Sequence, residues 1–392
     1  MKNKLKKTIL CFVDYYLPGY KAGGPIQSIA NLVENLGDEF EFYIICNDRD
    51  QLDRQPYANV KIDDWNVVSK ARVFYASRKN LNFKGIMKFL NETKYDLLYF
   101  NSFFSFKFTI LPLIIYKFFL LSKKPCIIAP RGEFSLGALK LKHIKKKIYL
   151  YISKSLGLYK NLYWQASSDN EKKDILRNFR IAQTHIDIAP DLIFYEPIAL
   201  NYLSLRKPGP LRIVFLSRIS PMKNLSFLLR VLQKVNFPIQ LSIYGPKEDL
   251  SYWKECLYLI DQLPSNIKLL IGDQVPHKQV KSILQKHDVF VLPTLGENFG
   301  YIIIEALIAG VPVIISDKTF WESDEEGALE ALALDEHVWL ERIIKWSKFD
   351  DHILKKKRQA ALTYAKNYYN TDLALKKNKE FFYSIFNSIN II

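Results

Sequence analysis

Two glutamates eight residues apart are the first side chains of this chain whose spacing suggests shared chemistry. They are Glu297 and Glu305, in the stretch LPTLGENFGYIIIEALIAGVPVII at 292–315. Its pattern predicts a strand, a loop that holds Glu297, a helix that ends near Gly310, and a second strand. Glu305 then lies about two helical turns beyond Glu297.

The residues between the two glutamates add donors for an anion. Backbone N–H groups at a helix start bind phosphate, and here they belong to Asn298, Phe299 and Gly300. Glu297 could hold a sugar, the helix start a diphosphate and Glu305 a ribose, which together describe a nucleotide-sugar. The alternative is that Glu297 caps the helix and Glu305 is a surface residue. The apolar run around Glu305 favours a function, because an unpaired buried charge is costly.

Cations and glycines follow other predicted strands. Arg218 directly follows the predicted strand LRIVFLS, and Lys223 comes five residues later. A guanidinium and an ammonium at the end of a strand suit a diphosphate, with a solvated turn as the alternative. Glycine turns follow three more strands, at Gly23 and Gly24, at Gly245, and at Gly272 before Val275; an ordinary turn explains each equally well.

Short apolar strands alternate with amphipathic helical segments, which predicts parallel sheets covered on both faces. The series occurs twice, with a break near NYLSLRKPGP. We predict two doubly wound, Rossmann-like domains, over 1–204 and 205–370, followed by a C-terminal helix over 371–392. Ligands of such sheets bind at the carboxyl ends of the strands. The predicted strands are TILCFV, FEFYIIC, LLYFN, PCIIAP, NLYWQA, LRIVFLS, PIQLSIYG, IKLLIG, DVFVLP and VPVIIS.

The bulk composition indicates a globular protein of two domains. The chain has 392 residues, of which 49% are hydrophobic and 24% charged, as in globular domains. The apolar run after MKNKLKK is too short for a signal peptide, and the run at 108–121 is too short to span a bilayer. We expect a cytoplasmic protein with buried, reduced thiols rather than disulfides or zinc. The four cysteines are Cys11, Cys46, Cys126 and Cys256.

The positive charge is concentrated in one part of the chain. The net charge is +16, and residues 101–160 hold 12 Lys/Arg against one acid, Glu133. Such a field attracts an anionic partner. A helix would place five apolar residues on one lysine-flanked face, a pattern of membrane-surface helices; a helix packed on the sheet is the alternative. The residues alone leave both interpretations of 103–160 open. The five residues are Leu139, Leu141, Ile144, Ile148 and Ile152.

Nucleic acid is the other large anion that the charge would suit. The sequence contains no recognition-helix or RNA-binding motif, so we expect no nucleic-acid partner, and a basic nucleic-acid-binding protein stays a remote alternative.

Several of these stretches together resemble the family 4 or "group 1" glycosyltransferases, which have the GT-B fold. The similar segments are GGPIQSIANL, SRISPMKN, YGP, IGDQVP and GENFGYIIIEALIAGVPVIISD, in the family's order. The resemblance implies two Rossmann-like domains that face across a cleft, with a C-terminal helix that packs back on the first. It also implies sugar transfer with retention of configuration and no metal or other cofactor. Lipid-diphosphate-linked sugars are frequent acceptors, which implies work at the inner face of the plasma membrane in cell-surface polysaccharide biosynthesis. The resemblance therefore favours peripheral contact with an anionic membrane through 103–160.

The resemblance also implies roles for residues of the second domain. Glu297, Arg218 and Lys223 would be catalytic: the glutamate on the transferred sugar, the two cations on the leaving diphosphate. The donor, UDP-sugar in most of the family and GDP-sugar in some, would be bound by Gly23, Gly24, Gly245, Val275, Asn298, Phe299, Gly300 and Glu305.

The first domain would bind the acceptor. Its APRGEFSLGAL stretch resembles a loop of polysaccharide-building members, which implies that Arg131 contacts an acceptor phosphate or sugar and Glu133 a hydroxyl. No histidine matches the one that many relatives carry. The stretch WQASSDNEKKDI predicts a helix start capped by Ser168 or Ser167, with Glu171 near the capping-box position.

Two stretches depart from the family pattern. IAPDLI stands where many relatives have Pro-Asn-Gly, and SDKTFWESDEEGALEAL is more acidic than expected and has Phe320 in place of proline. The GT-B fold also occurs in sugar-nucleotide epimerases and phosphorylase-like enzymes, which are the alternative functions.

Overall fold

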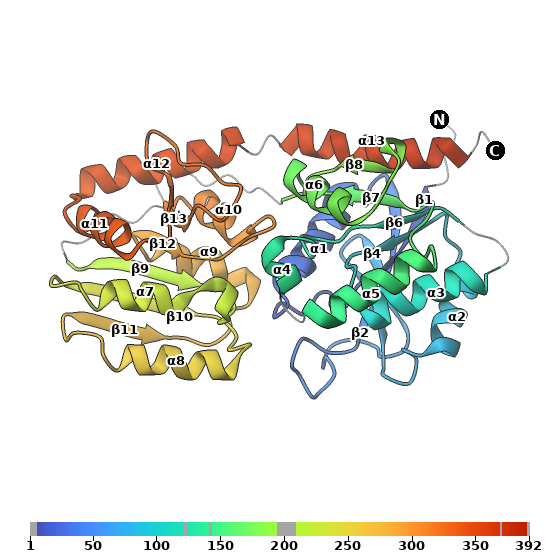
Figure 1. Ribbon diagram of the computed structural model, residues 1–392, viewed down its shortest axis with the longest axis horizontal. Coiled ribbons are helices and arrows are strands. Elements are labelled where there is room, and N and C mark those ends of the chain that lie inside the picture. Colours follow the sequence, from blue (N-terminus) through green and yellow to red (C-terminus); the bar gives the residue numbers. More distant parts are fainter. Residues whose placement is uncertain (1–5, 121–123, 141–142, 194–208, 369–370, 390–392) are drawn as a thin grey trace. The chain divides into compact units, whose positions relative to one another are not determined.

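The chain divides into two compact units (Figure 1). The first contains Met1–Phe194 and Thr371–Ile392, and the second contains Tyr195–Asn370. The domain boundary predicted near residue 205 lies outside the described residues. The computed structural model describes residues 6–120, 124–140, 143–193, 209–368 and 371–389.

The first unit is built on an eight-stranded sheet in the order β3-β4-β2-β1-β5-β6-β7-β8. All neighbouring strands are parallel except β3 and β4, which pair antiparallel. The strands are β1 (Lys7–Phe12), β2 (Phe40–Asn47), β3 (Trp65–Val68), β4 (Ala71–Ala76), β5 (Leu97–Phe100), β6 (Cys126–Ile128), β7 (Tyr163–Ala166) and β8 (Ile186–Ile188).

Local signals explain where the helices of this unit begin. Pro25 lies in the first turn of α1, which follows Gly23. The hydroxyl of Ser168 accepts from the Glu171 backbone N–H and caps α6. The helices are α1 (Gly24–Leu36), α2 (Phe83–Glu92), the π-helical turn η1 (Phe106–Ile110), α3 (Leu111–Phe118), α4 (Leu136–Lys140), α5 (His143–Ser155), α6 (Asp169–Asn178), the 3-10 turn η2 (Gln183–His185) and α13 (Thr371–Ile389).

The C-terminal helix α13 packs on the first unit (Figure 1). Phe382 is fully buried, with its ring 5.5 Å from that of Phe40. Asn378, also fully buried, donates to the Pro190 carbonyl at 2.8 Å. Tyr383 donates to Glu39 at 3.0 Å. Aromatic burial and these polar contacts hold the helix against the sheet.

The second unit has a six-stranded sheet in the order β11-β10-β9-β12-β13-β14, parallel throughout. The strands are β9 (Leu211–Leu216), β10 (Ile239–Tyr244), β11 (Ile267–Ile271), β12 (Val289–Leu292), β13 (Val313–Ser316) and β14 (Leu329–Leu332). The helices are η4 (Pro221–Lys223, 3-10), α7 (Leu225–Leu232), α8 (Leu250–Ile260), α9 (His277–Gln285), α10 (Tyr301–Ile308), α11 (Glu336–Ser347) and α12 (Asp351–Tyr368).

The prediction of two parallel-sheet α/β units is confirmed, and every strand named from the sequence is present. The sequence pattern missed β3, β4, β8 and β14. These are edge strands or their neighbours, and they are short or interrupted by polar residues. All four cysteines are buried and unpaired, as predicted. Among the described helices, none combines the length and the apolar character needed to cross a bilayer.

Each sheet has one place where the chain reverses the direction in which it adds strands. In the first sheet this switch point lies between β1 and β5, and in the second between β9 and β12. Loops leave in opposite directions there, which opens a crevice at the carboxyl ends of the strands, where ligands of such sheets bind.

Candidate functional site

Two of the predicted catalytic residues meet at the switch point of the second sheet. Lys223 ends η4 in the loop after β9, and Glu297 lies in the loop after β12. The Lys223 Nζ donates to the Glu297 Oε1. Only 11% of the lysine side chain and 10% of the glutamate side chain are exposed. A nearly buried ion pair of this kind is strongly coupled, since removing either partner leaves the other charge uncompensated.

Hydrogen bonds between the loops fix this pair in place. The Met222 carbonyl accepts from the Leu295 N–H at 2.8 Å and from the Thr294 hydroxyl at 3.0 Å. On the other side, the Ile219 N–H donates to the Pro246 carbonyl at 2.8 Å. The loops after β10, β9 and β12 are therefore held together as one assembly.

Gly245 makes the close approach of two of these loops possible. Its φ is +141°, and a Cβ built at this position would lie 1.9 Å from the carbonyl oxygen of Ser217. Only glycine fits without moving the backbone. The structure thus gives Gly245 a role in joining the ends of β9 and β10.

Arg218, the other predicted catalytic cation, lies at the end of β9 and has a different environment. It donates to both carboxylate oxygens of Glu248, at 3.0 and 3.1 Å. Both side chains are about one-third exposed, so this ion pair is worth little energy. The sequence reasoning missed Glu248, although it lies three residues beyond Gly245, the residue that follows β10.

The helix that carries Glu305 begins later than the sequence predicts. Gly300 is the N-cap of α10, with φ +78°, and no side chain caps the helix. Its left-handed backbone interrupts the helical path, so Asn298 and Phe299 precede the helix instead of forming its first turn. The Phe299 carbonyl accepts from the indole N–H of Trp321 at 2.7 Å. The alternative that Glu297 caps the helix is wrong.

Glu305 has a partner that the sequence reasoning missed. The Nε2 of His277, the first residue of α9, lies 3.1 Å from the Glu305 Oε1. Glu305 is 19% exposed and His277 is 50% exposed, so Glu305 is not an unpaired buried charge, and that argument for its function does not hold. The hydrogen bond to Glu305 raises the pKa of His277. The sequence did offer a signal for His277, because it lies two residues after Val275, a predicted donor-binding residue. Val275 is partly exposed.

The switch point of the first sheet carries a carboxylate and a hydroxyl. Asp14 follows β1, and its Oδ1 accepts from the Ser105 hydroxyl, in the loop after β5, at 2.8 Å. Burial raises the pKa of Asp14. Gly23 and Gly24 lie at the start of α1 in the loop after β1, and a Cβ at Gly23 would meet nothing within 4 Å. Asp14 was not predicted, although it directly follows the first predicted strand.

Glu133 binds the same loop as Asp14. Its carboxylate accepts from the Ser102 hydroxyl at 2.8 Å and from the Phe104 N–H at 3.0 Å. Burial raises its pKa as well. Two carboxyl groups of raised pKa therefore contact the loop at 101–105, at the carboxyl edge of the first sheet. Such groups can exchange hydrogen bonds with hydroxyls of a bound molecule.

Arg131 is held inside the first unit. Its guanidinium forms an ion pair with Asp191, in which 9% of the arginine and 3% of the aspartate side chain are exposed. It also donates to Asn101 at 2.8 Å and to the Tyr99 hydroxyl at 2.6 Å. These contacts connect the loops that follow β5, β6 and β8.

Glu171 holds the loop after β6, which carries Arg131 and Glu133, from another side. Its carboxylate accepts from the Gly132 N–H and from the Ser167 N–H and hydroxyl. The prediction of a capped helix start is confirmed, with Ser168 as the cap.

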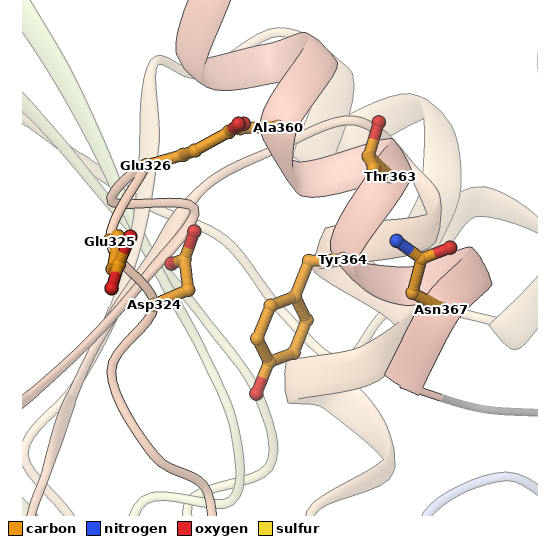
Figure 2. Close-up of a pocket in the computed structure, with 7 residues that line it drawn as sticks. All are labelled: Asp324, Glu325, Glu326, Ala360, Thr363, Tyr364 and Asn367. Atoms are coloured by element: carbon orange, nitrogen blue, oxygen red, sulfur yellow. The ribbon is translucent and has the colours of Figure 1, made fainter.

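A pocket elsewhere in the second unit is a poor match for a diphosphate (Figure 2). None of the predicted site residues lines it, and three carboxylates would repel an anion. In the described part of the chain, no group of three or more His, Cys, Asp or Glu side chains could hold a metal ion. The pocket residues are Asp324, Glu325, Glu326, Ala360, Thr363, Tyr364 and Asn367.

Part of the second unit is similar to a known family. Residues 204–348 match the family "Glycosyl transferases group 1". This segment contains the Lys223–Glu297 pair, Arg218 and Glu305. The match covers less than half of the chain.

Three relatives point in the same direction. An uncharacterized protein of the cps region of Klebsiella pneumoniae is 22% identical over 300 residues, 75% of this chain and 78% of the relative. The O-antigen chain mannosyltransferase B of Escherichia coli is 27% identical over 167 residues, covering 39% of this chain and 42% of the relative. An uncharacterized glycosyltransferase of Methanocaldococcus jannaschii is 29% identical over 106 residues, 26% of each chain. The chain therefore covers less than two thirds of the length of two of these relatives, the mannosyltransferase and the Methanocaldococcus jannaschii protein.

A solved structure shows the fold. HepE of Anabaena, solved in complex with UDP and glucose, superposes with a TM-score of 0.70 at 14% identity, covering 97% of this chain and all of HepE. The protein has the GT-B fold, and the matches together support transferase activity.

Proposed function

We propose that the protein is a glycosyltransferase that moves a sugar from a nucleotide-sugar, UDP-sugar in the first instance, to a glycan acceptor carried on a lipid, in cell-surface polysaccharide biosynthesis. The observation that carries this proposal is the contact of Lys223 with Glu297 at the β9/β12 switch point. HepE with bound UDP and the O-antigen mannosyltransferase support the choice of donor and pathway class.

The ion pair suits the bond that must break. In a nucleotide-sugar this bond joins the anomeric carbon to an oxygen of the diphosphate. A carboxylate accepts hydrogen bonds from sugar hydroxyls, and an ammonium attracts phosphate oxygens. Because Glu297 and Lys223 touch, a donor that uses both has its sugar–phosphate junction where they meet. Their loops are hydrogen-bonded together, so the charges are preorganised.

Arg218 supplies the second positive charge. Its exposed pair with Glu248 is weak, so the guanidinium can exchange that carboxylate for a diphosphate oxygen at small cost. Together the two cations stabilise the charge that develops on the leaving nucleoside diphosphate. In the proposed reaction the acceptor hydroxyl attacks from the leaving-group face and gives its proton to a donor phosphate oxygen. The sugar then keeps its configuration, and the two cations stabilise the leaving group without a metal or cofactor.

The remaining donor residues bind the ends of the nucleotide. Glu305 accepts from the ribose hydroxyls, and His277 orients its carboxylate from one side. Val275, in the loop before α9, lines the base. The loop at Asn298, Phe299 and Gly300 borders the sugar. Gly23 and Gly24 leave room for the diphosphate, and Gly245 shapes the turn after β10.

The first unit supplies the acceptor side of the proposal. Glu133 accepts from an acceptor hydroxyl, and we add Asp14, which binds the same loop. Arg131 supports this edge, because its buried ion pair with Asp191 fixes the loop that carries Glu133. The enzyme works in the cytoplasm, with peripheral contact to the membrane through 103–160.

A GT-B sugar-nucleotide epimerase or phosphorylase-like enzyme would use a similar donor site. UDP release separates these functions from transfer. A transferase releases UDP in step with glycan formation when an acceptor is present, whereas the alternatives convert the donor without a glycan acceptor.

The first test is thermal stabilisation by nucleotides and nucleotide-sugars, with Glu305→Ala and Glu255→Ala compared with the wild type. A ligand that binds the folded state raises Tm. We expect one nucleoside diphosphate or its sugar to stabilise the wild type and the Glu255→Ala control, which changes an exposed residue of α8, but not Glu305→Ala. Equal stabilisation of all three proteins would remove Glu305 from the donor site. Absence of any nucleotide response in the wild type would overturn the proposal.

A further inference from the structure

One face of α5 exposes a stripe of large apolar side chains. Helical geometry of about 100° per residue places Ile144, Ile148, Tyr151 and Ile152 within an arc of about 100°. The opposite side of α5 packs inward, where Leu150 and Ser153 are buried. The exposed fractions are 73% for Ile144, 55% for Ile148, 73% for Tyr151 and 48% for Ile152, and Leu156 in the following turn is 58% exposed.

This exposure bears on the two interpretations that the sequence left open. A helix packed on the sheet would bury its isoleucines, whereas the structure exposes all three. The predicted five-residue face is divided, because Leu139 of α4 packs on the core and Leu141 lies outside the described residues. The apolar stripe is therefore a property of α5 alone.

Lysines border the stripe. Lys147 and Lys154 lie along one flank of α5, and Lys145 lies on the other, all with exposed side chains. Residues 101–160 contain a single acid, Glu133, and its carboxylate is bound to the loop at 101–105. No carboxylate of this segment is therefore available to neutralise the lysines.

We propose that the outer face of α5 is a membrane-docking surface that lies in the plane of an anionic bilayer. Isoleucine side chains enter the boundary between headgroups and acyl chains, and the flanking lysines contact acidic headgroups. Tyr151 presents both an aromatic ring and a hydroxyl, a combination favoured at membrane interfaces.

The charge favours a lipid surface over a second copy of the chain. Two copies joined through α5 would bring like-charged lysines together, and the chain carries +16. An anionic bilayer satisfies the apolar stripe and its lysines at once. This surface gives the membrane contact of the proposed function a location, but vesicle binding requires no sugar nucleotide, so it can fail or succeed independently of transfer.

The test is flotation of the full chain with vesicles. We expect binding to phosphatidylcholine vesicles that contain about 30% phosphatidylglycerol, and weak binding to phosphatidylcholine alone, because each lysine contributes about fivefold at an acidic surface. The triple variant Ile144→Ser, Ile148→Ser, Ile152→Ser should lose at least about tenfold in partitioning. The control Leu250→Ser, Tyr258→Ser, which removes exposed apolar side chains of α8 in the second unit, should bind like the wild type.

A second variant covers the case in which the triple variant folds poorly. Lys145→Glu with Lys147→Glu changes exposed side chains only and should abolish the preference for anionic vesicles. Circular dichroism and nucleotide-induced stabilisation should match the wild type for both variants. Equal vesicle binding by wild type and triple variant would overturn the proposal. So would a wild-type dimer, seen by light scattering, that the triple variant loses while neither binds vesicles.

Discussion

The switch points of the two sheets have the same place in the topology but opposite chemistry. At β9/β12 a lysine meets a carboxylate in a nearly buried ion pair. At β1/β5 a carboxyl group meets a serine hydroxyl, and burial raises its pKa. The first arrangement suits a ligand with both hydroxyls and phosphate, and the second suits hydroxyls alone. One topology repeated twice thus presents two different chemistries at its switch points through a few strand-end residues.

One arginine in each unit also differs in its environment. Arg131 of the first unit is buried and held by Asp191, Asn101 and Tyr99. Arg218 of the second is partly exposed and held by Glu248. A buried guanidinium with several partners serves structure, because moving it would leave a buried charge unpaired. A partly exposed arginine with a weak partner is the one available to a ligand.

Removing the lysine at the β9/β12 switch point tests the largest difference between the units. Lys223→Ala should reduce kcat/KM by about 10²–10³-fold, because it removes a preorganised charge from the leaving diphosphate. Steady-state kinetics with a saturating acceptor measure the effect. Lys234→Ala is the matched control, since that lysine forms an ion pair with Glu336 on the surface. If both variants keep wild-type kinetics, the β9/β12 switch point does not carry the chemistry.

The turn that joins β9 and β10 can be tested through stability. Gly245→Ala should lower the free energy of unfolding by about 3 kcal/mol, because its Cβ overlaps the Ser217 backbone at a positive φ. Gly296→Ala is the control, with its nearest contact at 3.8 Å, and should change the stability by less than about 1 kcal/mol. Urea denaturation measures both. Similar losses in the two variants would contradict the role given to Gly245.

Changing Asp14 tests whether the β1/β5 switch point serves the acceptor only. Asp14→Asn should lower kcat/KM for the acceptor about tenfold, as expected for one hydrogen bond to a charged group. Donor-induced thermal stabilisation should stay unchanged. Asp96→Asn, in the same unit, changes a carboxylate that binds the Thr8 N–H at 2.9 Å, at the opposite edge of the sheet, and should leave the acceptor kinetics intact. A loss of donor binding in Asp14→Asn would break the division between the units.

The smallest expected effect concerns His277. Its pKa is raised by Glu305 above the ordinary 6.5, so the ion pair is fully formed below that value and is lost as pH rises through the raised pKa. The wild type should therefore exceed His277→Gln in stability by about 0.5 kcal/mol more at pH 6 than at pH 9, a modest value because the pair is partly exposed.

Urea denaturation at the two pH values measures this difference. His337→Gln, which changes an exposed histidine 3.8 Å from Glu341, is the control. A wild-type advantage that grows with pH would contradict the assignment of His277 to Glu305.

The α/β class, the central strands and most of the loops that carry the site could be predicted because these are local properties. Runs such as LRIVFLS and DVFVLP are apolar over the length of a strand, and parallel strands place all their carboxyl ends at one edge of a sheet. Arg218, Lys223 and Glu297 could therefore be named from their positions in the loops that follow strands. The edge strands β3 and β8 could not, because their sequences are short and carry little pattern.

By itself, then, the sequence determined which residues lie at the ends of strands. The tertiary structure decided which of them meet. Lys223 and Glu297 are 74 residues apart, Ser105 and Asp14 are 91 apart, and Glu305 finds His277 across 28. Strand order sets these partnerships, and strand order depends on the packing of the whole sheet. The exposure of α5 is decided in the same way, because a helix pattern shows that an apolar face exists but only packing shows whether another part of the chain covers it.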